Sequence, residues 1–376
     1  MRFPSIDLLR AVAIALMVTV HFVENLSGAW GEGVDFNRVG WLPAGFAAPL
    51  FTFLSGVSCS IWSDGLTRGG VSDAEIAKRT VRRGLFLFGL GIAFNVLVWL
   101  PEETFNWDIL TFIGSSLLVL AACRTMPPAI PPLIAVLAVA IAPVLRALAG
   151  YADFWQLGSY EPDLTLADVG LGFLCTGYFP LFPWLVFPIA GYAVAPAIFS
   201  SGPGGASLWP AAVSTSRRCG LVFGMGACLL AGGGLLILLP LPGPDGVLRR
   251  PWTMFPPTTA YVAVGLGLAL TALPLIHRWL DSPGQRPLGW PLAAAGVLSR
   301  HSLSIYLLHH ALHIWPLWIA GTWHGGEPTA FWQRCLPPAA SLGLALVFIL
   351  ACVPLFAGLE RRGYRGIEEL MRWLCD

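Results

Sequence analysis

The sequence is poor in charged residues. Asp, Glu, Lys and Arg make up 11% of its 376 residues, whereas about 25% is usual in a soluble domain. Hydrophobic residues make up 56%, and the mean hydropathy of +0.70 excludes an ordinary soluble fold and indicates a membrane protein. The net charge is only +1, and no basic cluster indicates a nucleic-acid partner.

Several other features are missing. The eight cysteines show neither a C-x-x-C pair nor zinc-ligand spacing, so neither a disulfide framework nor a structural zinc site is indicated. No cleavable signal peptide is recognisable, because the first apolar segment lacks a basic n-region and a convincing A-x-A site. No linker separates domains. We therefore expect one domain over residues 1–376, in which residues 358–376 form a cytoplasmic interfacial tail with Ile367, Leu370, Met371 and Leu374 on one helical face.

Ten apolar segments are long enough to cross roughly 30 Å of hydrocarbon. The predicted fold class is therefore all-α, a polytopic membrane bundle. Because the fourth segment is short and the ninth is long, nine or eleven crossings also fit. An arrangement with both termini in the cytoplasm places most of the 22 Lys and Arg residues on the inner side. The predicted spans are residues 5–26, 45–63, 83–101, 109–123, 130–148, 178–199, 219–241, 256–276, 292–320 and 336–357.

The first of these segments carries ionisable residues at membrane depth, which usually mark functional pathways. Arg10 and His21 are eleven residues apart, about three helical turns, so they share one face. Asp7 and Glu24 lie near the same stripe. His21 can accept and return a proton near neutral pH, with Glu24 orienting its ring. The alternative is a structural histidine bonded to a neighbouring polar group. Arg10 can pair with a carboxylate, or hold a phosphate or a thioester carbonyl.

A second polar segment, SRHSLSIYLLHHALHIW, runs from Ser299 to Trp315. Tyr306, His310 and His313 share one helical face. His309 and His313 have the i, i+4 spacing of metal ligands, but no H-E-x-x-H motif and no obvious third ligand accompany them. The sequence therefore predicts no metal site and instead a polar wall facing a buried cavity. Arg300, embedded in the same segment, and Asp108, at the external mouth of another helix, are also expected to line this cavity.

Charged and aromatic residues at the helix ends suggest binding surfaces. Ser72 followed by Glu75 predicts a helix N-cap box. In the same helix Arg79 and Arg82, which share a face, can grip a polyanion such as a nucleotide, although the positive-inside rule alone explains such basic clusters. Outside, the tryptophans Trp30, Trp41 and Trp155 suit the entrance for a sugar or, alternatively, an interfacial aromatic belt.

Seven segments in order carry a family resemblance: SIDLLRAVAIALMVTVHF, PLFTFLSGVS, RRGLFLFGLG, DILTFIGSSLLVL, YFPLFPWLVFPIAGYAV, FPPTTAYVAVGLGLAL and SRHSLSIYLLHH. Together they cover nearly the whole chain. The chain resembles the membrane acetyltransferases typified by heparan-α-glucosaminide N-acetyltransferase and its bacterial relatives, within a superfamily that includes polysaccharide O-acyltransferases. It departs from bacterial relatives at Thr111, where a histidine is frequent. Residues 29–44 also contain no histidine, which leaves His21 as the only candidate base in the first helix and loop.

The resemblance implies an enzyme that transfers an acyl group, expected to be acetyl, from cytoplasmic acyl-CoA to an amino or hydroxyl group of an extracytoplasmic glycan or glycolipid. It implies a catalytic role for His21, a shared cavity with Arg10, Tyr306 and His309, and CoA phosphates near Arg82 and Arg83. Acetyl-CoA is the expected donor, no metal is expected, membrane lipid is a partner and homo-oligomer formation stays open. The expected location is the bacterial inner membrane. The alternative is a proton-coupled transporter or flippase that uses the buried Arg and His groups as a relay.

Overall fold

Apolar segments fold as helices here because a backbone in lipid must satisfy its hydrogen bonds internally. The computed structural model describes residues 2–27, 44–99, 101–156, 159–199, 209, 213–239, 252–282, 289–323, 336–364 and 366–376. Within them, eight helical segments are long and apolar enough to cross a membrane. The prediction of an all-α polytopic bundle is confirmed. The eight segments are Pro4–Ser27, Asp73–Val98, Glu103–Cys123, Ile130–Leu148, Leu166–Phe199, Thr215–Leu238, Thr259–Leu280 and Pro338–Arg361.

The helices follow one another with short connections in most of the described chain. The long helices are α1 (Pro4–Ser27), α2 (Ala47–Arg68), α3 (Asp73–Val98), α4 (Ile109–Cys123), α5 (Ile130–Leu148), α9 (Val186–Phe199), α10 (Thr215–Leu238), α11 (Thr259–Leu280), α12 (Trp290–Arg300), α13 (Ser302–Trp323) and α15 (Pro338–Arg361). The short elements are η1 (Ala44–Phe46), η2 (Pro101–Phe105), α6 (Tyr151–Phe154), β1 (Trp155–Gln156), β2 (Ser159–Tyr160), α7 (Leu166–Leu171), η3 (Gly172–Thr176, a π-helical turn), α8 (Leu181–Trp184) and α16 (Ile367–Cys375).

Two of the ten predicted spans are helical but are not among the eight. The segment 45–63 lies in α2, whose serine and threonine residues lower its hydropathy. The segment 292–320 is not one long helix, as its length had indicated, but the two helices α12 and α13. The interruption falls at His301, which caps α12 and turns its side chain towards Glu360 of α15. The count of ten crossings stays a prediction.

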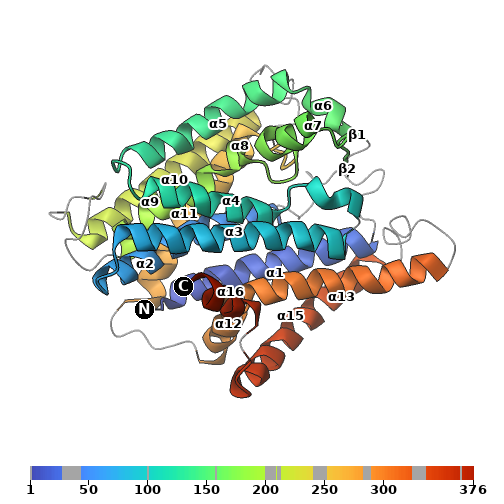
Figure 1. Ribbon diagram of the computed structural model, residues 1–376. Helices are drawn as coiled ribbons and strands as arrows, with labels where there is room; N and C mark the ends of the chain where they lie inside the picture. The colour runs from blue at the N-terminus through green and yellow to red at the C-terminus, as the bar shows by residue number, and fades with distance from the viewer. Residues whose placement is uncertain are drawn as a thin grey trace.

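Helix α1 runs through the middle of the bundle (Figure 1). It packs against α2 and α11 on one side and against α12, α13 and α15 on the other. Its buried side chains contribute to two hydrophobic clusters, one shared with α2, α4, α9 and α11 and one shared with α12 and α15. This central position explains why polar groups of α1 meet other helices instead of lipid.

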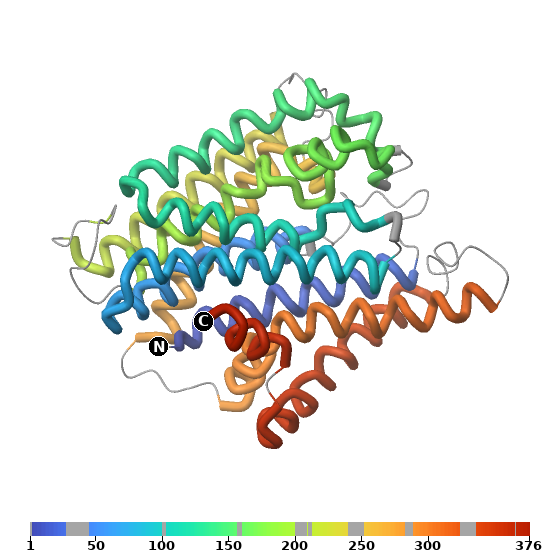
Figure 2. Tube along the Cα trace, in the orientation of Figure 1, coloured from blue at the N-terminus to red at the C-terminus, as the bar shows by residue number. Residues whose placement is uncertain are grey.

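Both chain termini lie at the end of the bundle where α3 begins (Figures 1 and 2). We call this end the proximal end and the opposite one the distal end. Asp376, the last residue, pairs with Arg83 of α3. That both termini lie in the cytoplasm stays a prediction.

Polar side chains begin several of the helices. Ser72 accepts a hydrogen bond from the backbone N–H of Glu75, which confirms the predicted cap of α3. Because of this cap, α3 begins at Asp73, ten residues before the predicted span 83–101. Asp108 caps α4 in the same manner and accepts from the N–H groups of Leu110 and Thr111.

The predicted interfacial tail forms α16, which packs against α3 and α13. Glu368 of α16 is 7% exposed, and its carboxylate accepts from the backbone N–H and the hydroxyl of Ser304, at 2.8 and 2.7 Å. The tail thereby caps the first turn of α13, where a negative charge is favourable. Leu370, Trp373 and Leu374 are exposed, as expected of a helix at an interface.

Candidate active site

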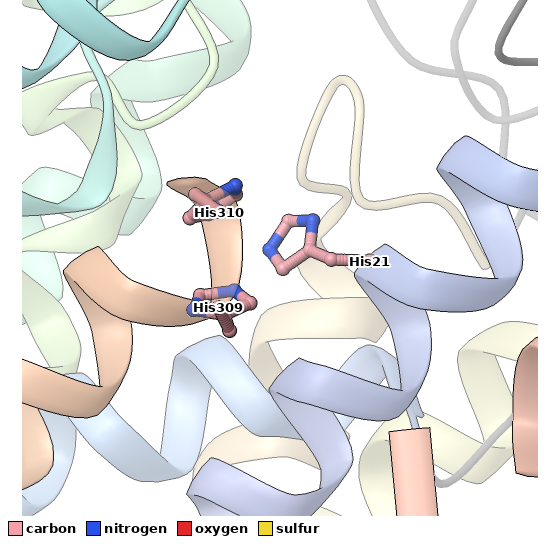
Figure 3. Close-up of side chains that lie close together, drawn as sticks. All are labelled: His21, His309 and His310. Atoms are coloured by element: carbon pink, nitrogen blue, oxygen red, sulfur yellow. The ribbon is translucent and has the colours of Figure 1, made fainter. Parts of the chain in front are cut away.

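His21 lies in the distal part of α1 and faces the histidines of α13 (Figure 3). The centroid of its ring is 4.5 Å from that of His310 and 5.4 Å from that of His309, and the rings of His309 and His310 are 4.0 Å apart. The α13 residues are buried, at 0% exposure for His309 and 2% for His310. The side chain of His21 is 30% exposed, so it is the most accessible of these three histidines.

Hydrogen bonds set the tautomers of two of these histidines. Nδ1 of His309 lies 3.1 Å from the carbonyl oxygen of Ile305, which only accepts, so Nδ1 carries the proton. In the same manner Nδ1 of His313 donates to the carbonyl of His309 at 2.5 Å, and its Nε2 accepts from the amide of Asn25 at 2.7 Å. His313 is thus fully bonded. His309 keeps a lone pair on Nε2, which is buried without a hydrogen-bond partner.

Glu24 lies one turn after His21 on α1. The distance from its Oε2 to Nδ1 of His21 is 3.9 Å, and its side chain is 47% exposed. This is ion-pair range but longer than a hydrogen bond. Glu24 therefore does not hold the His21 ring by a hydrogen bond in this geometry, and the two form an ion pair only while the imidazole is protonated.

Tyr306 connects α13 to the start of α4. Its hydroxyl donates to Oδ2 of Asp108, the residue that caps α4. Its ring lies beside those of His309 and His310, at 5.5 and 5.2 Å, and Phe94 of α3 packs against Tyr306 and His310. The structure thus brings Asp108, Tyr306 and His309 together with His21 around one buried polar cluster.

Arg10 lies about 16 Å from His21 along α1 at 1.5 Å per residue. Its guanidinium donates to two hydroxyls, that of Ser58 of α2 at 2.5 Å and that of Ser299 of α12 at 3.1 Å. In the described part of the chain no carboxylate forms an ion pair with it. Asp7, the expected partner on α1, pairs with Arg2 at 3.0 Å instead. A half-buried guanidinium held only by hydroxyls retains the capacity to bind an anion or a carbonyl oxygen.

Arg300 belongs to a different group of charges. It forms a bidentate pair with Glu360 of α15, at 2.5 and 2.9 Å. Nε2 of His301 lies 3.0 Å from the same carboxylate. Arg300 therefore joins α12 to α15 near the proximal end, and its side chain does not contact the histidine cluster.

The three arginines at the start of α3 have different surroundings. Nε of Arg79 donates to Glu75 at 3.0 Å. Arg83 forms a bidentate pair with Asp376, with its Nε 2.8 Å from Oδ1, and its guanidinium lies 4.0 Å from the ring centroid of Trp62. Arg82 is exposed and forms no ion pair with a described residue. Of the three, Arg82 is the most accessible to a phosphate.

Two of the tryptophans predicted at the acceptor entrance, Trp30 and Trp41, lie outside the described residues. Trp155 is half-buried, and its indole is nearly parallel to the rings of Tyr151 at 5.7 Å and Phe255 at 5.2 Å. Its Nε1–H donates to the carbonyl of Thr176. Tyr160 belongs to the same packed cluster, and its burial there raises the pKa of its hydroxyl to about 12. Trp155 is therefore part of a packed aromatic cluster, which leaves little of its ring surface for stacking on a sugar.

The family of the chain follows from a comparison with known proteins. Residues 2–226 match the family model described as heparan-alpha-glucosaminide N-acetyltransferase, catalytic. The chain belongs to this family. The match spans more than half of the chain and includes α1 with Arg10 and His21, and it confirms the resemblance seen in the sequence. It places the chain among the transmembrane acetyltransferases. No curated protein matches the chain.

The structure adds residues that sequence reasoning did not assign to the site. The ring of His310 is nearer to His21 than that of His309, the histidine of α13 that the family resemblance implied for the cavity. Asn25 also belongs to the site, because its amide bonds His313. Its position four residues after His21, on the same face of α1, is the sequence signal that points to it. Glu360 and Glu368 bind Arg300 and Ser304, and no local pattern pointed to them because their partners are about sixty residues away in the sequence.

Proposed function

We propose that this protein transfers an acyl group, most simply acetyl, from cytoplasmic acyl-CoA to an amino or hydroxyl group of an extracytoplasmic glycan or glycolipid. The observation that carries the proposal is the position of His21. His21 is a partly exposed histidine in the distal part of a central helix, and it lies beside two buried histidines. The chain that carries it belongs to an acetyltransferase family.

In this proposal the proximal end faces the cytoplasm of a bacterial inner membrane and receives the nucleotide part of acyl-CoA. Arg82 is accessible for a phosphate, and Arg79 and Arg83 would bind phosphates in exchange for their present carboxylate partners. Arg10, held by Ser58 and Ser299, is placed to bind the donor along its path towards His21. The acceptor enters from the distal end, where the side chain of His21 is partly exposed.

At the distal end His21 takes the proton of the attacking amino or hydroxyl group, the thioester C–S bond breaks, and the proton passes to the departing CoA sulfur. In the second route His21 itself accepts the acyl group as CoA leaves, and then passes it to the acceptor. Glu24, at 3.9 Å, stabilises the protonated imidazole that forms in the first route. Asp108 and Tyr306 hold α13 against α4 and so keep His309 and His310 beside His21. A positioned general base contributes about 10²- to 10⁴-fold to a rate.

The test is transfer of label from radiolabelled acetyl-CoA by purified protein in detergent, with glucosamine-type acceptors. His21→Ala should lower the transfer rate at least ~100-fold. His277→Ala is the matched control, because His277 is bonded to Asp281 at the proximal end, away from the cluster. Transfer at the wild-type rate by His21→Ala would refute the assignment.

Two further measurements separate the mechanisms and the alternative. Label retained on the wild-type protein without acceptor, and absent from His21→Ala, would indicate an acyl-histidine intermediate. Substrate counterflow in liposomes without any acyl donor would instead support a transporter that uses Arg10 and His21 as a relay.

A further inference from the structure

Three imidazoles converge between α1 and α13 in an arrangement typical of metal ligands. One ring nitrogen each from His21, His309 and His310 lies within 4.8 Å of the other two. We propose that these three histidines bind one divalent transition-metal ion, with Zn²⁺ as the best fit. The sequence predicted no metal site because the third ligand, His21, is almost three hundred residues away from the other two.

The strongest observation is the bonding of His309. Its Nδ1–H donates to a backbone carbonyl of its own helix, and this is the contact that orients a metal-binding histidine and leaves Nε2 free to coordinate. That Nε2 atom is buried and has no hydrogen-bond partner. Nδ1 of His310 is likewise buried without a partner. Buried polar atoms without partners are costly, and a cation shared by both residues would satisfy them.

His21 completes the set from the opposite side. Its Nδ1 is the atom near Glu24, and its other ring nitrogen points towards His309 and His310 (Figure 3). Zinc–nitrogen bonds of about 2.0–2.1 Å in a tetrahedron place the nitrogens roughly 3.4 Å apart. The three nitrogens lie within 4.8 Å of one another, so side-chain rotations would have to bring them closer by up to about 1.4 Å to bind the ion.

The ligand set also selects the metal. Three neutral imidazoles suit Zn²⁺, Co²⁺ or Cu²⁺, and not Mg²⁺ or Ca²⁺, which prefer oxygen ligands. His313 is excluded, because both its nitrogens are already bonded, to the carbonyl of His309 and to Asn25. Among the described residues no fourth histidine, cysteine or carboxylate joins the group, so the fourth position would be open to water.

One consequence rests on the proposed function. The metal ion would occupy the lone pair of His21 that, in the proposed function, accepts either the proton of the acceptor or the acyl group. A metal-loaded protein would therefore be inhibited in acyl transfer, and a chelator would restore its activity.

The experiment measures metal directly, on full-length protein purified in detergent through a tag without histidines. After incubation with Zn²⁺ and removal of the free ion, elemental analysis should find about one Zn²⁺ per wild-type chain. Co²⁺ should give the visible absorption of a tetrahedral site. His309→Ala and His310→Ala should each lose both signals. His277→Ala, which leaves the cluster intact, should retain them.

Two results would overturn the proposal. The first is wild-type protein with no bound Zn²⁺ and no Co²⁺ spectrum. The second is loss of metal in His313→Ala but not in His310→Ala, which would assign a different ligand set. Metal content is read without acyl-CoA or acceptor, so failure of this site and failure of the proposed acyl transfer are separate outcomes.

Discussion

Replacing Tyr306 by phenylalanine removes one hydroxyl from the centre of the site and leaves the ring in place. The hydroxyl is the donor to Oδ2 of Asp108, whose Oδ1 accepts from two backbone N–H groups of α4. Tyr306 is 5% exposed, so water cannot easily replace it. A hydrogen bond to a charged group contributes about 1.5–3 kcal/mol. We therefore expect Tyr306→Phe to lose about 2 kcal/mol of unfolding free energy.

The same change should affect activity, because the bond joins α4 to the helix that carries His309 and His310. A displacement near 1 Å can lower an enzymatic rate about 100-fold. We expect acyl transfer by Tyr306→Phe to fall roughly 10- to 100-fold. Unfolding in mixed micelles and transfer from labelled acetyl-CoA measure the two effects on the same preparation.

Tyr261→Phe is the matched control. Tyr261 is fully buried and its hydroxyl also donates a single hydrogen bond, but to the neutral carbonyl of Gly45, away from the histidines. Its loss should cost about 1 kcal/mol and leave transfer by the folded protein unchanged. If Tyr306→Phe were no less stable than Tyr261→Phe and transferred acyl groups at the wild-type rate, the Asp108–Tyr306 contact would have no role in holding the site.

Two further predictions concern stability and the tail. Gly191→Ala should destabilise the bundle by about 3 kcal/mol, because a Cβ there would lie 2.1 Å from the carbonyl oxygen of Phe53; Gly65→Ala, with open space around it, should be tolerated in the same thermal-unfolding assay. Glu368→Ala should cost about 2–3 kcal/mol and increase hydrogen exchange in the first turn of α13, because the backbone N–H of Ser304 loses its acceptor. Unchanged exchange there would show that α16 does not cap α13.

Much of the fold was predictable because lipid leaves the backbone few options. Each of the ten apolar segments is helical over most of its length in the described residues, and the cap at Ser72 followed from its spacing to Glu75. The helix break at His301 was not predictable from hydropathy, since apolar residues continue on both sides. It depends on Glu360 and Glu368, which reach His301 and Ser304 from α15 and α16.

By itself, the sequence determined that this is a helical membrane protein and that Arg10 and His21 share a helix face, because composition and the 3.6-residue period are local properties. Only the tertiary structure decided the partners of these groups. It placed His21 beside His310 and His309, Arg10 between two serines, and Arg300 against Glu360. Such pairings join helices far apart in the chain, and they depend on how the helices pack, which no local spacing encodes.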